Sequence, residues 1–281
     1  MRRVAVGKLS VLAGDNRALP PLVLLHGFLG SGEEWLDIAA ALSDRFMPVL
    51  VDLPGHGLSI VGEDAGPDAF FSDTVDAVAS VVRWFLTETE AAGGRAFLAG
   101  YSMGGRIALM LALRFPELFA AGVIVSASPG LASTGERERR RWHDGQVALK
   151  IERHFGSFLE GWYAQPLFAT LKAHPRFASV VAQRRVNEPH QVARALQLLG
   201  PGWQPPQWEL LRSNRIPLCF FIGEKDERYV EIGRQMVTFT PDAHLELFAG
   251  CGHALHIESE ALFVERLREF FNQQSAIRTI P

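Results

Sequence analysis

Cysteine is scarce in this chain of 281 residues, which contains only Cys219 and Cys251. Cys219 lies within an apolar run and Cys251 in a Gly-rich turn, and neither belongs to a CxxC or metal-ligand spacing. The scarcity excludes a disulfide framework of the kind that small secreted proteins use. It favours a reducing, cytoplasmic setting, and no pattern of ligands predicts a metal site or a cofactor site.

Charge of one sign and long apolar runs are also lacking. The formal net charge is −3, which gives no long-range attraction to nucleic-acid phosphates or to anionic lipid. No segment approaches the ~20 apolar residues of a membrane span, and no apolar stretch follows the basic start. We therefore expect an unprocessed protein with no nucleic-acid partner and no membrane partner, whereas the oligomeric state stays open.

Short apolar runs alternate with longer helical patterns, and this alternation predicts a doubly wound, mostly parallel α/β sheet. Most of the runs are apolar on both faces, as expected for parallel strands covered by helices. The expected strands are Leu22–Leu25, Pro48–Val51, Ala96–Ala99, Gly122–Val125, Pro217–Ile222 and His244–Phe248. The expected helices are Trp35–Leu42, Thr74–Thr87, Arg106–Phe115, Ile232–Thr238 and Leu262–Phe271.

The stretch 129–206 breaks this rhythm, because it is rich in Arg, Trp, His and Gln and its apolar pattern is helical throughout. A Pro-Gly-Trp-Gln-Pro-Pro segment at 201–206 closes it, since consecutive prolines cannot continue a helix. We interpret 129–206 as a helical cap inserted into a core formed by 1–128 and 207–281.

A serine on a tight turn is the strongest chemical signal. Gly100-Tyr-Ser-Met-Gly104 follows one expected strand and precedes one expected helix. Such a turn needs glycines on both sides and raises the Oγ of Ser102 at the carboxyl edge of the sheet. The pattern predicts a nucleophilic or basic serine; the alternative is a Gly-rich turn with a capping serine.

A serine hydroxyl requires a histidine within hydrogen-bonding reach to act at neutral pH. His253 lies after the last expected strand, which is the place that this chain order requires. His26 and His56 precede the serine and lie in turns, so we expect structural roles for both.

Asp226 follows the strand Pro217–Ile222 and lies between Ser102 and His253 in the chain, so it is the expected acid. Glu224 and Glu227 are its local rivals, and a solvated acidic loop is the alternative for all three.

Leu25-His-Gly-Phe28 follows an early strand and predicts an oxyanion hole made by the backbone amides of Phe28 and Met103. Gly27 permits the close approach of the backbone. The segment Asp52-Leu-Pro-Gly-His-Gly-Leu-Ser59 is expected to be a structural loop.

Together these motifs resemble the α/β-hydrolase superfamily over the whole chain. Within it the chain is similar to the MenH family, 2-succinyl-6-hydroxy-2,4-cyclohexadiene-1-carboxylate synthase of menaquinone and phylloquinone biosynthesis. The residues that carry this resemblance are Leu53-Pro-Gly-His-Gly, Gly100-Tyr-Ser-Met-Gly-Gly-Arg106, Ser128-Pro-Gly-Leu131 before an arginine-rich helix, and Trp162-Tyr-Ala-Gln-Pro-Leu-Phe168.

The resemblance implies a helical cap, a triad of Ser102, Asp226 and His253, and several substrate-binding residues. These are the arginines Arg106, Arg140 and Arg184, with Tyr101, Trp162 and Tyr163 around the pocket. The neighbouring Arg185 is an alternative to Arg184, and both Trp162 and Tyr163 are equally compatible with cap core.

Guanidinium groups are the natural partners of the carboxylates that the family's substrate carries. We expect Arg106 to point toward the pocket floor; a surface pair with an acid is its alternative. For Arg137, Arg139 and Arg141 we expect a solvated helix face.

The implied reaction is a lyase reaction without cofactor on a small anionic substrate: a proton is removed beside the succinyl ketone and pyruvate is expelled. A carboxylester or carbon-carbon bond hydrolase of the same fold is one alternative, and a non-catalytic ligand receptor is another.

Overall fold

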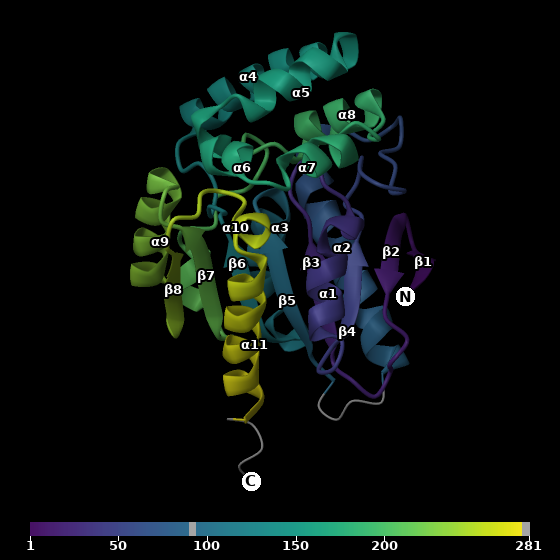
Figure 1. Cartoon of the computed structure of the whole chain (residues 1–281), viewed down its shortest axis with the longest axis vertical. Coiled ribbons are helices and arrows are strands. Elements are labelled where there is room, and N and C mark those ends of the chain that lie inside the picture. Colours follow the sequence, from purple (N-terminus) through teal and green to yellow (C-terminus); the bar gives the residue numbers. More distant parts are fainter. Residues whose placement is uncertain (90–93, 277–281) are drawn as a thin grey trace.

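A mixed, mostly parallel sheet forms the centre of the computed structural model, which describes residues 1–89 and 94–276 (Figure 1). In the described chain its eight strands run in the order β1-β2-β4-β3-β5-β6-β7-β8. The strands from β3 onward pair in parallel, whereas β2 is antiparallel to both β1 and β4. The strands are β1 Arg2–Val6, β2 Leu9–Ala13, β3 Pro21–Leu25, β4 Met47–Val51, β5 Ala96–Tyr101, β6 Phe119–Val125, β7 Leu218–Gly223 and β8 Ala243–Phe248.

The α/β fold class predicted from the alternation is confirmed, and so are the six expected strands, with small shifts of their ends. Strands β3 to β7 are buried along their whole length because helices cover both faces of the sheet. The hairpin of β1 and β2 was missed. In β1 the two arginines Arg2 and Arg3 are exposed at the edge of the sheet, so the segment lacks the apolar run that marks the central strands.

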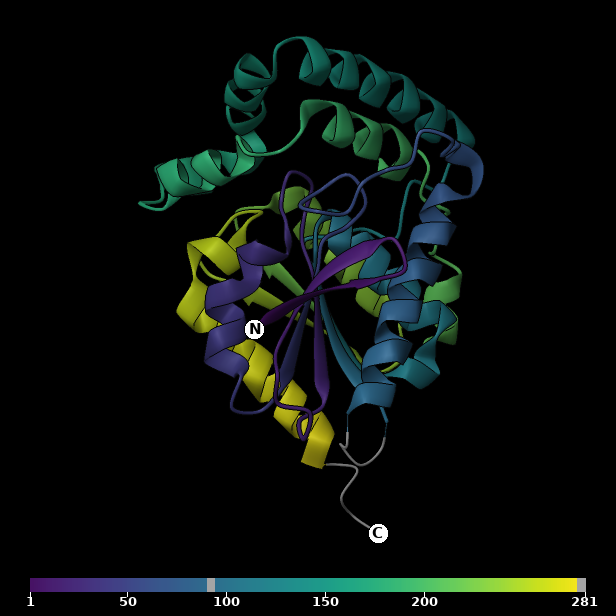
Figure 2. The ribbon, with the colours of Figure 1, turned by 90° about the vertical axis from the view of Figure 1, so that its right-hand side faces the viewer.

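Helices cover the two faces of the sheet in separate sets (Figure 2). On one face, α1 (Leu36–Leu42) and α11 (Glu260–Ala276) contribute side chains to one apolar cluster. On the other face, α2 (Pro67–Glu88), α3 (Met103–Arg114) and α9 (Glu227–Phe239) contribute to a second cluster. The two layers fix the sheet, so the loops at its carboxyl edge have a rigid base.

Helix α2 begins at Pro67, seven residues before the expected start at Thr74. A proline at the first helical position has no amide hydrogen to lose and carries a backbone angle suited to a helix, so Pro67 marks a start that the apolar spacing does not show. Phe71 is buried in that first part of the helix. Helix α3 likewise starts at Met103, directly after the predicted nucleophile.

Five helices join β6 to β7 and lie over the carboxyl edge of the sheet (Figure 1). They are α4 (Thr134–Arg153), α5 (Phe155–Tyr163), α6 (Ala169–Ala173), α7 (Phe177–Arg184) and α8 (Pro189–Leu199). All of them fall within 129–206, the range interpreted as a cap. Helix α4 begins with a capping box in which Ser133 and Glu136 satisfy each other's backbone amides.

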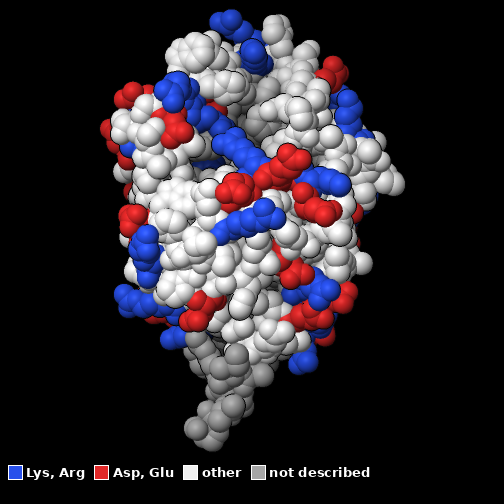
Figure 3. Space-filling model, turned by 90° about the vertical axis from the view of Figure 1, so that its left-hand side faces the viewer, with Lys and Arg blue, Asp and Glu red and all other residues white. Residues whose placement is uncertain are grey.

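The remaining elements are short. They are the 3-10 helices η1 (Gly32–Trp35), η2 (Pro116–Leu118), η3 (Pro166–Phe168) and η4 (Leu210–Ser213), and helix α10 (Leu255–Glu258). Among the described residues, no helix has the length and apolar character that a membrane crossing requires. On the face shown in Figure 3, basic and acidic side chains lie side by side, so this face presents a mixed field rather than one of a single sign.

Candidate active site

The turn at Ser102 joins β5 to α3 and has the strained backbone of a nucleophile turn. Ser102 adopts φ 51° and ψ −106°, which a residue with a side chain rarely occupies. A side chain at Gly104 would collide with the backbone of Leu25 and His26, and one at Gly100 with the backbone of Gly104. Only glycines therefore allow β5, the turn and the loop after β3 to approach so closely.

Ser102, His253 and Asp226 come together at the carboxyl edge of the sheet, where they follow β5, β8 and β7. The Nε2 of His253 lies 3.1 Å from the Oγ of Ser102, and its Nδ1 lies 2.6 Å from the Oδ2 of Asp226. A carboxylate can only accept, so Nδ1 carries the proton and Nε2 is free to accept from the hydroxyl. His253 and Asp226 are both buried.

The two rivals of Asp226 lie elsewhere in the same loop. Glu224 is exposed and accepts a hydrogen bond from the backbone of Gly250. Glu227 is exposed at the edge of the cavity described below, and neither carboxylate has a recorded hydrogen bond to His253 within the described chain.

The amides of Phe28 and Met103 flank the serine, and both residues line the same cavity as Ser102. Met103 is the first residue of α3, where a backbone N–H has no partner within the helix. In the described ranges 1–89 and 94–276, the N–H of Phe28 has no recorded acceptor. Two unpaired donors beside the serine Oγ are the arrangement that a developing oxyanion requires.

Two buried histidines hold the loop that carries Phe28. The Nε2 of His26 accepts from the amide of Leu53, and the Nε2 of His56 accepts from the amide of Leu29. Burial lowers the pKa of His26 to about 4 and that of His56 to about 3, so both rings are neutral at pH 7. The geometry thus gives both histidines structural contacts.

A cavity of about 480 Å³ opens above Ser102, between the core and the cap. The core contributes Ser102, Phe28, Met103, Arg106 and Tyr229, together with His253. The cap contributes Arg140, Asp144 and Trp162. Trp162 also packs edge-on against Phe28, with ring centroids 5.4 Å apart.

Arg106 lies in the first turn of α3 with only 7% of its surface exposed. One guanidinium nitrogen donates to the carbonyl of Leu199 at 2.7 Å, and another lies 3.5 Å from the Oε1 of Gln204. No carboxylate of the described residues pairs with it within 4 Å. Burial, and then the neighbouring Arg140, lower the pKa of Arg106 to about 10, so it stays charged at pH 7.

Arg140 approaches the same cavity from α4. Its Nε donates to the Oδ1 of Asp144, one helical turn later, at 2.8 Å. The other oxygen of Asp144 is buried without a recorded partner in the described chain, and burial raises the pKa of this carboxyl group. The pair leaves the terminal nitrogens of Arg140 available to a ligand.

Two tyrosines predicted to line this cavity lie elsewhere. Tyr101 is buried behind the triad, with its ring 5.4 Å from that of His253, because the following turn points Ser102 and not Tyr101 outward. Tyr163 faces the interior of the cap, where its hydroxyl accepts from the Nε of Arg184. The prediction that Tyr101 and Tyr163 line the cavity is therefore corrected.

Arg184 is committed to a buried ion pair with Glu34 of η1. Glu34 also accepts a hydrogen bond from the Nε2 of His256 at 3.0 Å, so the three side chains form a cluster that joins α7 to the core. The alternative, Arg185, is exposed and does not line the cavity above Ser102. Neither arginine lines the cavity above Ser102.

The arginine-rich start of α4 is only partly solvated. Arg139 is exposed as predicted. Arg137, however, donates to the carbonyls of Leu131 and Ala132, and Arg141 lies 4.6 Å over the ring of Trp203. The prediction of a solvated face is therefore wrong for Arg137 and Arg141, whose side chains contact the segments that flank the start of α4.

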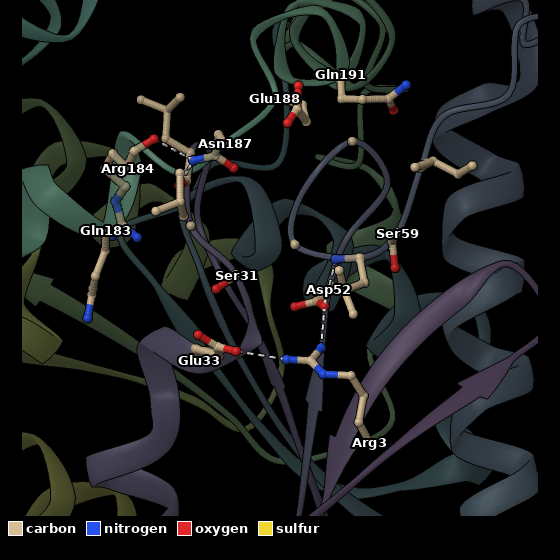
Figure 4. Close-up of a pocket in the computed structure, with 17 residues that line it drawn as sticks. Arg3, Ser31, Glu33, Asp52, Ser59, Gln183, Arg184, Asn187, Glu188 and Gln191 are labelled. Atoms are coloured by element: carbon tan, nitrogen blue, oxygen red, sulfur yellow. Dashed lines mark hydrogen bonds and ion pairs between the residues drawn. The ribbon is translucent and has the colours of Figure 1, made fainter. Parts of the chain in front are cut away.

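A second cavity, of about 470 Å³, lies where the cap meets the loop after β4 (Figure 4). Asp52 forms its floor and accepts from the amides of Gly32 and Leu58 and from Arg3. These bonds occupy both carboxylate oxygens, as expected for the structural loop predicted at Asp52–Ser59. Asn187 and Arg184 contribute to the opposite, cap side of this cavity.

Asp144 and Tyr229 are polar residues of the cavity that were not predicted from the sequence. Asp144 stands four residues after Arg140, a spacing that signals a helical ion pair, but nothing in the sequence shows that it is buried. Tyr229 lies in the first turn of α9 with its ring 4.9 Å from that of His253, and its position three residues after Asp226 carries no recognisable pattern. In the described ranges, no group of three His, Cys, Asp or Glu side chains could hold a metal ion.

Residues 20–260 match the family model described as the alpha/beta hydrolase fold. The chain belongs to the alpha/beta hydrolase family. Within it, the 2-succinyl-6-hydroxy-2,4-cyclohexadiene-1-carboxylate synthase of Citrobacter koseri is 30% identical over 257 residues, which cover 91% of this chain and 95% of that protein. The protein PHYLLO, chloroplastic, of Arabidopsis thaliana is 32% identical over 92% of this chain, which spans only 16% of that protein's length.

Solved structures agree with this grouping. MenH from S. aureus superposes with a TM-score of 0.87 at 26% identity and covers 95% of this chain and 98% of its own. A thermophilic esterase from Thermogutta terrifontis has a TM-score of 0.78 over 98% of this chain at 22% identity, which shows a shared fold alone. The resemblance to the MenH family stated from the motifs is thus confirmed, as a relationship of sequence and fold.

Proposed function

We propose that this protein is a carbon-oxygen lyase that eliminates pyruvate from 2-succinyl-5-enolpyruvyl-6-hydroxy-3-cyclohexene-1-carboxylate to give 2-succinyl-6-hydroxy-2,4-cyclohexadiene-1-carboxylate. The observation that carries the proposal is Arg106, a buried guanidinium without an acidic partner among the described residues, at a cavity that contains a serine triad. A buried cation is stable only beside a counter-charge, so a bound carboxylate would complete its environment. The related synthases support the identity of that anion.

The three catalytic residues have distinct roles in this proposal. Ser102, activated by His253, removes the proton next to the succinyl ketone, and Asp226 holds the protonated imidazole in place. The amides of Phe28 and Met103 stabilise the enolate oxygen. The electron pair then forms the C2=C3 double bond, the C3=C4 pair moves to C4=C5, and the C5–O bond breaks. The enolpyruvate that leaves takes up a proton at its methylene carbon to become pyruvate, while His253 gives up the proton that it received from Ser102. Arg106 and Arg140 hold substrate carboxylates, and no acyl enzyme forms.

Mass spectrometry of the products tests the proposal directly. In water enriched in ¹⁸O, the enolpyruvyl substrate should give pyruvate and a ring product whose succinyl carbonyl carbons gain no enzyme-dependent ¹⁸O. A carboxylester or carbon-carbon bond hydrolase would place ¹⁸O in a new carboxylate, because water completes its turnover. Ligand binding without product, in a protein whose triad is intact, would instead indicate a receptor.

We further propose a cytoplasmic protein whose partner is a small anion rather than nucleic acid or membrane. Both cysteines are free and buried, and burial raises the pKa of the Cys219 thiol to about 12, which keeps it unreactive. Activity and melting temperature should therefore not change when a reducing agent is added. A loss on reduction would contradict this setting.

A further inference from the structure

The oxyanion loop has a support from the cap that the proposed mechanism does not use. Asn187, just beyond the end of α7, donates through Nδ2 to the carbonyl of Leu29 at 2.8 Å and to the carbonyl of Arg184 at 3.0 Å. Leu29 directly follows Phe28. One side chain of the cap thus links the end of α7 to the loop that carries the proposed oxyanion donor (Figure 4).

Leu29 needs such a support because its backbone is strained. Its φ is 67°, in the left-handed region that a leucine occupies at a cost of about 1–2 kcal/mol. The core holds one side of this residue, since its amide donates to the Nε2 of His56 at 3.1 Å. Asn187 holds the other side, at the carbonyl.

Two peptide planes connect this carbonyl to the amide of Phe28. In the plane between Leu29 and Gly30, the carbonyl faces Asn187 and the N–H, on the opposite side, donates to the carbonyl of Gly27 at 3.0 Å. In the plane between Gly27 and Phe28, that carbonyl also accepts from the Nδ1 of His26 at 2.7 Å. Because a trans peptide places C=O and N–H on opposite sides, fixing the carbonyl of Gly27 fixes the direction of the Phe28 N–H.

We propose that Asn187 is a positioning residue of the oxyanion hole: its hydrogen bond to Leu29 is passed through two peptide planes to the amide of Phe28. The inference rests on the proposed oxyanion hole, though not on the identity of the substrate. Aligned hydrogen bonds also polarise one another, so the chain strengthens the donor that it aims. The buried pair of Arg184 and Glu34 fixes the end of α7 three residues earlier and thereby sets the place of Asn187.

Asn187→Asp and Asn187→Ala test this role. Aspartate keeps the shape of the side chain but cannot donate, and it faces two carbonyl oxygens; alanine removes the contact. For both variants kcat should fall about tenfold with KM unchanged, less than the 10²–10³ that follows complete removal of an oxyanion donor. Gln183→Ala is the matched control. Like Asn187, Gln183 lines the second cavity, above Asp52, but it is exposed and has no recorded hydrogen bond in the described chain.

An alkylboronic acid gives a readout that a purely structural role would not change. The Oγ of Ser102 adds to boron, its proton passes to His253, and boron becomes a tetrahedral anion with one oxygen at the amides of Phe28 and Met103. Its inhibition constant does not depend on how much protein is active. It should rise about tenfold in both Asn187 variants and stay unchanged in Gln183→Ala.

The outcomes separate the inference from the proposed function. Unchanged kcat and boronate affinity in Asn187→Asp, with boronate binding abolished in Ser102→Ala, would overturn the positioning role and leave the triad standing. A fall in melting temperature with unchanged boronate affinity would also overturn the positioning role, because Asn187 would then only stabilise the contact between cap and core. A wild-type protein that binds no boronate would contradict the active site itself, and the positioning role with it.

Discussion

Two buried arginines, Arg106 and Arg184, look alike until their partners are compared. Arg106 is 7% exposed and Arg184 is 5% exposed, and burial lowers the pKa of each to about 10. Arg184, however, faces Glu34 in a closed cluster. Among the described residues Arg106 donates to a carbonyl and an amide oxygen but forms no ion pair, and it opens onto the cavity at Ser102. The partner, and not burial or pKa, distinguishes Arg184, whose counter-charge lies within the fold, from Arg106, for which we propose a bound anion as the counter-charge.

The surroundings of the two arginines differ in the same way as their partners. The cluster of Arg184, Glu34 and His256 satisfies its charges internally and joins cap to core. The cavity of Ser102, Arg106 and Arg140 has open donors above a serine triad. Substitutions in the cluster should therefore change stability, whereas substitutions in the cavity should change turnover.

The largest effect should come from the triad on the cavity side. Ser102→Ala, His253→Ala and Asp226→Asn should each lower turnover by at least about 10³-fold, because triad members act as a unit. The free energy of unfolding should change little for Ser102→Ala, whose hydroxyl is only half-buried. Steady-state kinetics and urea unfolding measure the two quantities. Near-full activity of Asp226→Asn would move the acid to Glu227 or Glu224.

Arg184→Ala should have the largest effect on stability. It leaves the buried carboxylate of Glu34 without its cation, which costs about 3–5 kcal/mol in the free energy of unfolding. Arg185→Ala, at the exposed neighbour, is the control and should cost under about 0.5 kcal/mol. If Arg184→Ala leaves the urea midpoint unchanged but weakens substrate binding, Arg184 belongs to the substrate and the comparison fails.

Arg106→Ala should show the opposite behaviour. The specificity constant for the proposed carboxylate substrate should fall by a factor equivalent to about 2–4 kcal/mol, the size of a lost buried charge contact. The specificity constant for a neutral ester should not change. Arg106→Lys keeps the charge but loses the two-pronged donor, so a substantial part of the loss should remain.

Arg139→Ala provides the matched control for this experiment. Arg139 is exposed on α4 beside Arg140, whereas the nearby Arg137 donates to the carbonyls of Leu131 and Ala132 and is therefore not a neutral site. If neither Arg106→Ala nor Arg139→Ala lowers the specificity constant for the proposed substrate, the result would favour a general hydrolase.

Core elements were predictable because one local pattern determines each of them. The turn around Ser102 needs glycines, and the chain order places His253 and Asp226 at the ends of parallel strands, so three distant residues could be brought together from the sequence. The fold class follows from strands that are apolar on both faces. Strand β1 lacks this signal because it is the edge strand and is largely exposed.

Cap residues could not be assigned in the same way. An arginine on a helix carries no mark of its partner, and Arg184 differs from Arg106 only through Glu34, which lies 150 residues away in the chain. Tyr163 and Trp162 are adjacent, yet one faces the cap interior and the other the cavity. Such choices depend on how the cap sits on the core, which no short motif encodes.

The smallest expected effect is the pH dependence of the free energy of unfolding, to which His256 of the closed cluster contributes. Burial lowers the pKa of His256 and His56 to about 3 and that of His26 to about 4. As the pH falls from 7, the unfolded chain, whose histidines titrate near pH 6.5, binds protons that the native state does not, so stability is lost between about pH 7 and pH 4. Between pH 7 and pH 6 the loss should be about 0.7 kcal/mol per histidine, or about 2 kcal/mol for the three. Urea unfolding at the two pH values measures it.

His256→Gln isolates one of these three contributions, since an amide can still donate to Glu34 but does not titrate. All other titrating groups are shared with the wild type, so they cancel in the comparison. The variant should lose about one third less stability than the wild type between pH 7 and pH 6. An equal loss in both proteins would mean that His256 is protonated beside Glu34 in the native state. The closed cluster would then hold two cations against the single carboxylate of Glu34. It would carry an uncompensated positive charge, as the cavity at Arg106 does.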